Sequence, residues 1–74
     1  MAKTFSGRQI INILCRHFDF YFVSQKGSHV KLRRCLGDKI ITTVIPLHKE
    51  LAFGTLKGIL ELGQVNERDF WNAV

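Results

Sequence analysis

The sequence predicts a small α+β domain in which a three-stranded antiparallel sheet carries helices on one face and leaves the other face open to water. Two observations support this fold class. Apolar residues recur at helical spacing towards both ends of the chain, and three strand-like segments separated by short turns lie between them. The chain has 74 residues, so we expect one domain over residues 1–74 and exclude a multidomain enzyme.

The first element is predicted to be a helix over residues 7–16. Ser6 is a good N-cap residue, and Gln9 three positions later completes a capping box, in which each side chain bonds the backbone N–H of the other residue. Leu14 lies on the apolar face of this helix. The helix is expected to end near Asp19.

Three strands are predicted to form a meander, in which each strand pairs with the next one along the chain. They span residues 20–25, 29–33 and 39–45. Gly27-Ser28 marks the first turn, because glycine tolerates the positive φ that a tight hairpin needs. Leu36-Gly37-Asp38 marks the second turn. Pro46 ends the third strand because proline has no N–H to donate to a neighbouring strand.

A second helix is predicted over residues 54–62. Gly63 follows it, and glycine favours the position just after a helix. Asn66 is a good cap for a short final helix, which gives the order α-β-β-β-α with one additional helix. We expect four apolar side chains in the core and two cations at the surface, namely Leu14, Leu32, Ile59 and Leu60 in the core and Lys31 and Arg33 at the surface.

The charge of the chain is uneven. The formal net charge is +5, and residues 1–39 hold eight of the eleven basic residues but only two of the six acidic ones. A run of charge is usually a solvated face, but here it shares a short segment with a Gly-Ser turn and a histidine. This combination favours a polyanionic partner. The cations are densest at Lys26, Lys31, Arg33, Arg34 and Lys39.

Neither a membrane segment nor a cofactor is expected. The apolar runs are far shorter than the ~20 residues of a membrane helix, and residues 1–4 carry no apolar signal-peptide core. Two cysteines, Cys15 and Cys35, fit a reducing compartment, so we expect a cytoplasmic protein. Together with His17 and His48 they match none of the usual zinc-ligand spacings, and no metal site is predicted.

His29 is the strongest candidate for a catalytic residue. It follows Gly27-Ser28 at the mouth of the predicted hairpin, and strand alternation directs it to the same face as Lys31 and Arg33. A histidine side chain gains and loses a proton near neutral pH. Lysine and arginine beside it can hold a phosphate. The pattern therefore suits metal-free cleavage of RNA, although a surface histidine without a function has the same spacing.

Other residues give weaker indications. His48 is either a second acid or base, or a loop histidine with a local role, and the second interpretation is favoured. The aromatic run from Phe20 to Phe22 should turn at least one ring away from the core, where it can stack on a base; a core contact under a helix edge is an equally favoured interpretation. No phosphate-binding loop occurs in the chain, and its six acidic residues show no close pairing that suggests a two-metal site, so a nuclease of this sequence would have to work without metal.

Four segments of the chain resemble one known family in order. They are Ser6-Gly7-Arg8-Gln9-Ile10-Ile11, Lys26-Gly27-Ser28-His29, Val44-Ile45-Pro46-Leu47-His48, and Glu50-Leu51 with Gly54-Thr55-Leu56 and Ile59-Leu60. In this order they resemble HicA-type toxins, the mRNA interferases of HicA/HicB toxin–antitoxin pairs. The likeness runs from about residue 5 to residue 70.

This resemblance implies a double-stranded-RNA-binding-domain-like fold and cleavage of mRNA without the ribosome. It implies that His29 is the catalytic residue, with Gly27 and Ser28 shaping its turn. It also implies a HicB-type antitoxin that binds the toxin and masks this histidine. From the residues themselves we add Lys26, Lys31 and Arg33 as phosphate contacts.

Two other functions remain open at this stage. The first is a non-catalytic RNA-binding module of the same fold, in which the basic face holds RNA and His29 only contacts it. The second is a protein-interaction domain whose positive charge complements an acidic partner. Three results would separate these functions. Cleavage of RNA supports the toxin, binding of RNA without cleavage supports the RNA-binding module, and binding only to a protein supports the interaction domain.

Overall fold

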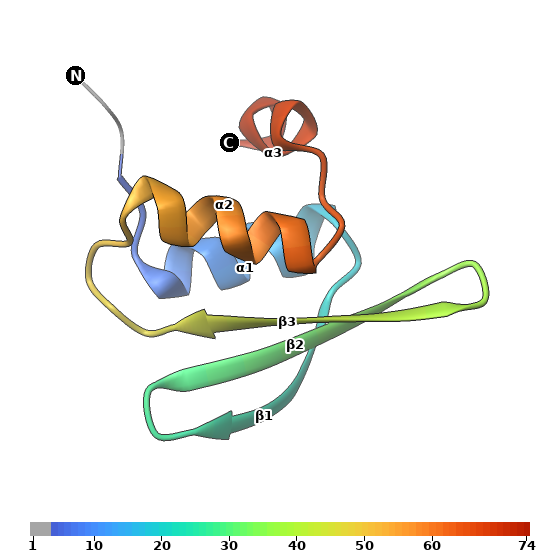
Figure 1. Ribbon diagram of the computed structural model, residues 1–74, viewed down its shortest axis with the longest axis horizontal. Coiled ribbons are helices and arrows are strands. Elements are labelled where there is room, and N and C mark those ends of the chain that lie inside the picture. The colour runs from blue at the N-terminus through green and yellow to red at the C-terminus, as the bar shows by residue number, and fades with distance from the viewer. Residues whose placement is uncertain (1–3) are drawn as a thin grey trace.

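The computed structural model describes residues 4–74 and confirms the predicted fold class. Residues 1–3, on which the expectation about a signal peptide partly rests, lie outside the described residues. Helices α1 and α2 lie on the same side of the three-stranded sheet, as Figure 1 shows. The elements are α1 (Gly7–His17), β1 (Tyr21–Lys26), β2 (His29–Leu36), β3 (Lys39–Pro46), α2 (Phe53–Leu62) and α3 (Glu67–Ala73).

The predicted capping box starts α1. The Gln9 N–H donates to the Ser6 hydroxyl oxygen at 3.1 Å, and the Ser6 N–H donates to the Gln9 side-chain oxygen at 2.8 Å. The helix ends at His17, one residue later than predicted. Asp19 then takes a left-handed conformation with φ 60°, which aspartate adopts more readily than most residues with a Cβ. This conformation turns the chain into β1.

The sheet has the order β1-β2-β3 and is antiparallel throughout. The central strand β2 runs to Leu36, three residues beyond its predicted end, because its last residues pair with the start of β3 at Lys39. The strand β1 begins at Tyr21, and the register shifts between Phe22 and Ser24, which marks a β-bulge. The hairpin of β2 and β3 extends past the helices, as Figure 1 shows.

The core lies between the sheet and the two longer helices. All four predicted core residues are buried, with exposed fractions of 0% for Leu14 and Leu32, 4% for Ile59 and 3% for Leu60. One polar side chain lies among them. The hydroxyl of Thr43 on β3 donates to the carbonyl oxygen of Ile59 at 2.9 Å, which fixes α2 against the sheet.

Arg34 points towards the helices and not towards solvent. Its guanidinium donates to the carbonyl oxygens of Phe18 at 3.4 Å, Gly63 at 3.0 Å and Gln64 at 2.7 Å. The same group lies 5.0 Å from the centre of the Phe20 ring. One arginine of the central strand therefore joins the end of α1 and the end of α2 to the sheet.

The turn after α2 differs from the prediction. Gly63 caps the helix in an ordinary right-handed conformation with φ −79°, and it is Gln64 that takes the left-handed one, with φ 52°. Glycine nevertheless suits this position because the space around Gly63 is tight. A Cβ there would lie 3.0 Å from the Phe20 ring and 3.3 Å from the Ile59 carbonyl oxygen.

Candidate active site

Three segments distant in sequence meet at one end of the sheet. They are the start of α1, the turn between β1 and β2, and the end of β3 (Figure 1). The Leu47 N–H donates to the Ser28 carbonyl at 2.7 Å, and the Gly7 N–H donates to the His48 carbonyl at 2.9 Å. Glycine is needed at Gly7 because a Cβ there would overlap the Pro46 carbonyl oxygen. These contacts hold the hairpin turn in a defined position.

His29 is the first residue of β2, and its side chain is exposed. It pairs with Lys26 on one side and Pro46 on the other. Side chains of directly opposite residues have Cβ atoms about 4.5–5.5 Å apart, so the Lys26 ammonium can reach the imidazole. Lys31 follows on the same face, about 7 Å further along the strand, and is exposed as predicted.

The turn before His29 has the conformation that its sequence predicts. Gly27 has φ 59°, the left-handed region that glycine enters without strain. The side-chain amide of Gln25 donates to the Gly27 carbonyl at 3.0 Å and holds the turn from one side. Ser28 is exposed, so its hydroxyl is open to a ligand beside His29.

Arg33 is half-buried, and the prediction that it would be exposed is wrong. It lies in the central strand, where its Nε donates to the Thr42 hydroxyl on β3 at 3.2 Å. This bond fixes the direction of the guanidinium. On the other side Arg33 pairs with Tyr21, whose ring is 49% exposed. The expectation that at least one aromatic ring faces away from the core is confirmed by Tyr21, while Phe22 lies on the inner side of the sheet and is 58% exposed there.

Strand alternation and register place Lys26, His29, Lys31 and Arg33 on the face of the sheet that the helices leave uncovered. We call this surface the outer face. None of the three strands contains an acidic residue, so the outer face is positively charged. Lys39 of the predicted basic cluster lies at the far end of the sheet, in the second hairpin.

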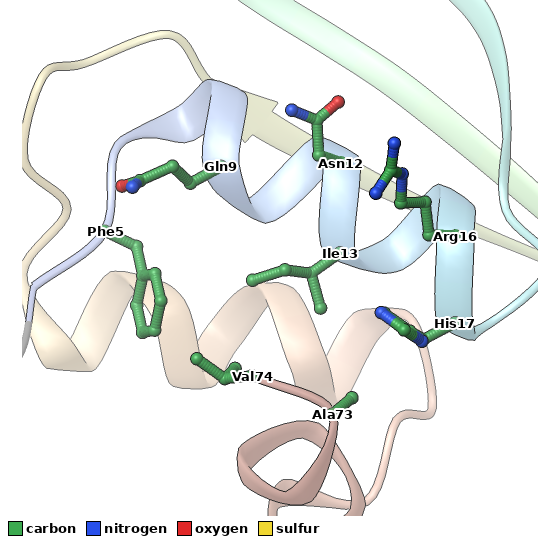
Figure 2. Close-up of a pocket in the computed structure, with 8 residues that line it drawn as sticks. All are labelled: Phe5, Gln9, Asn12, Ile13, Arg16, His17, Ala73 and Val74. Carbon is green, nitrogen blue, oxygen red and sulfur yellow. The ribbon is translucent and has the colours of Figure 1, made fainter.

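A hollow of about 320 Å³ lies away from the outer face, between α1 and the C-terminal segment. Figure 2 shows Phe5, Ile13 and Val74 directed into this space. His17 also lines it, at the end of α1. None of the predicted site residues lies there, so size alone does not identify the site.

Three further findings concern possible ligands of other kinds. Within residues 4–74 no group of three or more histidine, cysteine or acidic side chains is arranged to hold a metal ion. In the same range no helix combines the length and apolarity needed to cross a membrane. Both cysteines are free thiols, and burial raises the pKa of the Cys15 thiol while Cys35 is exposed.

The comparison with known families identifies the chain. A family model described as HicA toxin of bacterial toxin–antitoxin matches residues 7–65, which runs from the start of α1 to just beyond α2. The chain belongs to the HicA toxin family. A comparison with curated proteins found no match. The resemblance given by the Gly-Ser-His turn and its companion segments is thereby confirmed, and this HicA chain is the toxin of a toxin–antitoxin pair.

Sequence reasoning missed a second hollow, of about 270 Å³, on the inner side of the first hairpin. Residues of α1, β1 and β2 line it together with Leu47, which follows β3. Four segments contribute one or a few side chains each, so no local pattern in the sequence marks it. The exposed aromatic residue Phe22 was the one available signal.

Proposed function

We propose that this HicA toxin is an endoribonuclease that cleaves mRNA independently of the ribosome. It acts in the cytoplasm as a single domain over residues 1–74 and belongs to a type II toxin–antitoxin system. The observation that carries the proposal is the arrangement of the outer face. His29 is exposed there at the start of the central strand, between Lys26 and Pro46. Lys31 and Arg33 follow it along the same face.

The chemistry proposed is an internal transfer of the phosphate. His29 takes the proton from the ribose 2′-hydroxyl, whose oxygen attacks the neighbouring phosphorus. The bond from phosphorus to the 5′-oxygen breaks, and the imidazolium returns its proton to that oxygen, leaving a 2′,3′-cyclic phosphate and a 5′-hydroxyl. Lys26, Lys31 and Arg33 neutralise the phosphate, and the Gly27-Ser28 turn offers it a backbone N–H and a hydroxyl. No cofactor takes part.

The direct test is to incubate the purified chain with an mRNA transcript in the absence of ribosomes and in the presence of a chelator. We expect fragments that carry 2′,3′-cyclic phosphate and 5′-hydroxyl ends. Binding of the transcript without cleavage would support the non-catalytic RNA-binding alternative. Cleavage that stops when the chelator is added would replace the mechanism with a metal-dependent one.

Removing two cations from the outer face should weaken RNA binding for every sequence. Each phosphate contact releases counterions, so Lys31→Ala combined with Arg33→Ala should reduce the salt slope of binding by about two units. Fluorescence anisotropy at several salt concentrations measures this slope. Lys57→Ala combined with Arg68→Ala is the matched control, because it removes the same charge from α2 and α3. An equal change in both double variants would contradict a specific role for the outer face.

We further propose that the partner is a HicB-type antitoxin that covers His29. The outer face mixes cations with exposed apolar side chains, of which Ile40 is 67% and Val44 37% exposed. Such a mixed surface is typical of protein interfaces. An antitoxin that fits it should be acidic opposite Lys26 and Lys31 and apolar opposite Ile40 and Val44.

If charge steers this encounter, the association rate should fall with increasing salt, while the dissociation rate changes little. Stopped-flow mixing of toxin and antitoxin measures both rates. Hydrogen exchange of the complex should show protection in β2 and in the first turn. Protection confined to α2 and α3 would contradict this mode of inhibition and indicate an allosteric one.

A further inference from the structure

The hollow on the inner side of the first hairpin has a mixed lining. Ile11, Val30 and Leu47 contribute apolar side chains, and Arg8, Asn12 and Gln25 contribute polar ones. Phe22 completes it, with a ring that is 58% exposed. No acidic residue is among the side chains that line the hollow. A flat apolar ring, a cation and two amides around one hollow match three features of a nucleotide, namely the face of its base, its phosphate and the polar edge of its base.

One polar group of the hollow, the Gln25 amide, is held in place by a hydrogen bond. The Gln25 side-chain N–H donates to the Gly27 carbonyl at 3.0 Å, which fixes the amide and leaves its oxygen to accept a hydrogen bond from a base. Arg8 and Asn12 lie one helical turn apart on α1 and are both exposed. Arg8 therefore supplies a cation to this hollow from α1, and Gln25 supplies an amide from β1.

The hollow adjoins the candidate catalytic residue. In the register of β1 and β2, the pair Gln25–Val30 is followed directly by the pair Lys26–His29. Consecutive Cα atoms along a strand are about 3.8 Å apart. Because strand side chains alternate, the hollow and the imidazole lie back to back across the end of the sheet. A single strand of RNA that passes around the hairpin can contact both. A base held in a duplex cannot, because its ring is stacked and its edge is paired.

We propose that this hollow binds one nucleotide of single-stranded RNA next to the cleaved bond and sets the base preference of cleavage. The ring of Phe22 stacks on the base, the amides of Asn12 and Gln25 contact its edge, and Arg8 binds the adjacent phosphate. This inference rests on the proposed ribonuclease function and adds a substrate class to it, namely single-stranded RNA.

The test uses the full chain in a His29→Ala background, so that RNA is bound without being cut. The probe is a short, fluorescently labelled single-stranded RNA of randomised sequence. Phe22→Leu should weaken binding about 5-fold to 150-fold, because it keeps an apolar side chain but loses the stacking ring. Phe22→Tyr keeps the ring and should restore the affinity. Phe53→Leu is the matched control, since Phe53 is also 58% exposed but lies at the start of α2, outside the hollow.

The second readout is the position of cleavage in an mRNA transcript, with His29 present. Phe22→Leu and Gln25→Ala should each relax the base preference beside the cut, whereas Phe53→Leu should leave it unchanged. Unaltered affinity and unaltered cleavage positions in Phe22→Leu would overturn the nucleotide site, while His29-dependent cleavage would still support the proposed function. A loss of antitoxin binding without any loss of RNA binding would overturn it as well and assign the hollow to the protein partner. A wild-type chain that neither binds nor cuts RNA would overturn both proposals.

Discussion

His29→Ala should abolish RNA cleavage while the fold stays intact. Loss of a general acid/base typically lowers a rate by about 10²–10⁴-fold, and a residue that both takes and returns the proton should be at the upper end of this range. The side chain is exposed at the start of β2 and contributes little to packing, so stability should change by no more than about 0.5 kcal/mol. Initial cleavage rates and thermal unfolding of the same preparation measure the two effects.

His17→Ala is the matched control for this substitution. His17 is also an exposed histidine, but it lies in the last turn of α1 and lines the hollow next to the C-terminal segment. Its removal should leave cleavage and toxicity unchanged. A His29→Ala protein that cuts RNA at the wild-type rate would contradict the mechanism, whatever the effect of His17→Ala.

His48→Ala tests whether a second histidine shares the acid and base roles in RNA cleavage. His48 lies at the same end of the sheet, where its carbonyl accepts the Gly7 N–H. If it is a loop residue, as we expect, the rate should fall much less than in His29→Ala. An equal fall, together with loss of one limb of a bell-shaped pH profile, would assign the acid and base roles to two residues.

Local patterns in the sequence predicted the elements and most of the outer face. The capping box, the glycine turn and the strict alternation of the middle strand each depend on residues close together in the chain. The fold class, the four core residues and the exposure of Lys31 were therefore predicted correctly. The side on which Lys31 and His29 lie follows from the two-residue period of a strand, which needs no knowledge of the tertiary structure.

The errors occur where a residue's surroundings come from distant segments. Arg33 and Arg34 are consecutive cations in the central strand, and strand alternation places them on opposite faces without showing what each side chain contacts. In the fold, Arg34 donates to backbone carbonyls just beyond the ends of α1 and α2, and Arg33 donates to the hydroxyl of Thr42. Gly63 was expected for its conformational freedom, but its position is one where the small size of glycine suits the tight space beside Phe20.

Leu60→Ala should destabilise the domain by about 2–5 kcal/mol, because it removes a buried side chain and leaves a cavity. Leu60 is 3% exposed in α2, where it packs in the core between helices and sheet. A core in a chain of this length supplies only about 3–5 kcal/mol, so a large fraction of the variant should be unfolded. Urea unfolding followed by circular dichroism measures the change in the free energy of unfolding.

Leu62→Ala is the matched control, since it removes the same atoms from the same helix at a position that is 63% exposed, and it should change stability by no more than about 0.5 kcal/mol.

The consequence of Leu60→Ala for activity follows from the contacts of α2. The helix holds β3 through the hydrogen bond from Thr43 to Ile59, and β3 pairs with β2 where His29 lies. Leu60→Ala should therefore lose RNA cleavage in proportion to its unfolded fraction. Cleavage should return when an added osmolyte favours the folded state, whereas His29→Ala should stay inactive under the same conditions. A stable Leu60→Ala protein with a well-dispersed NMR spectrum would show that α2 does not contribute to the core in this way.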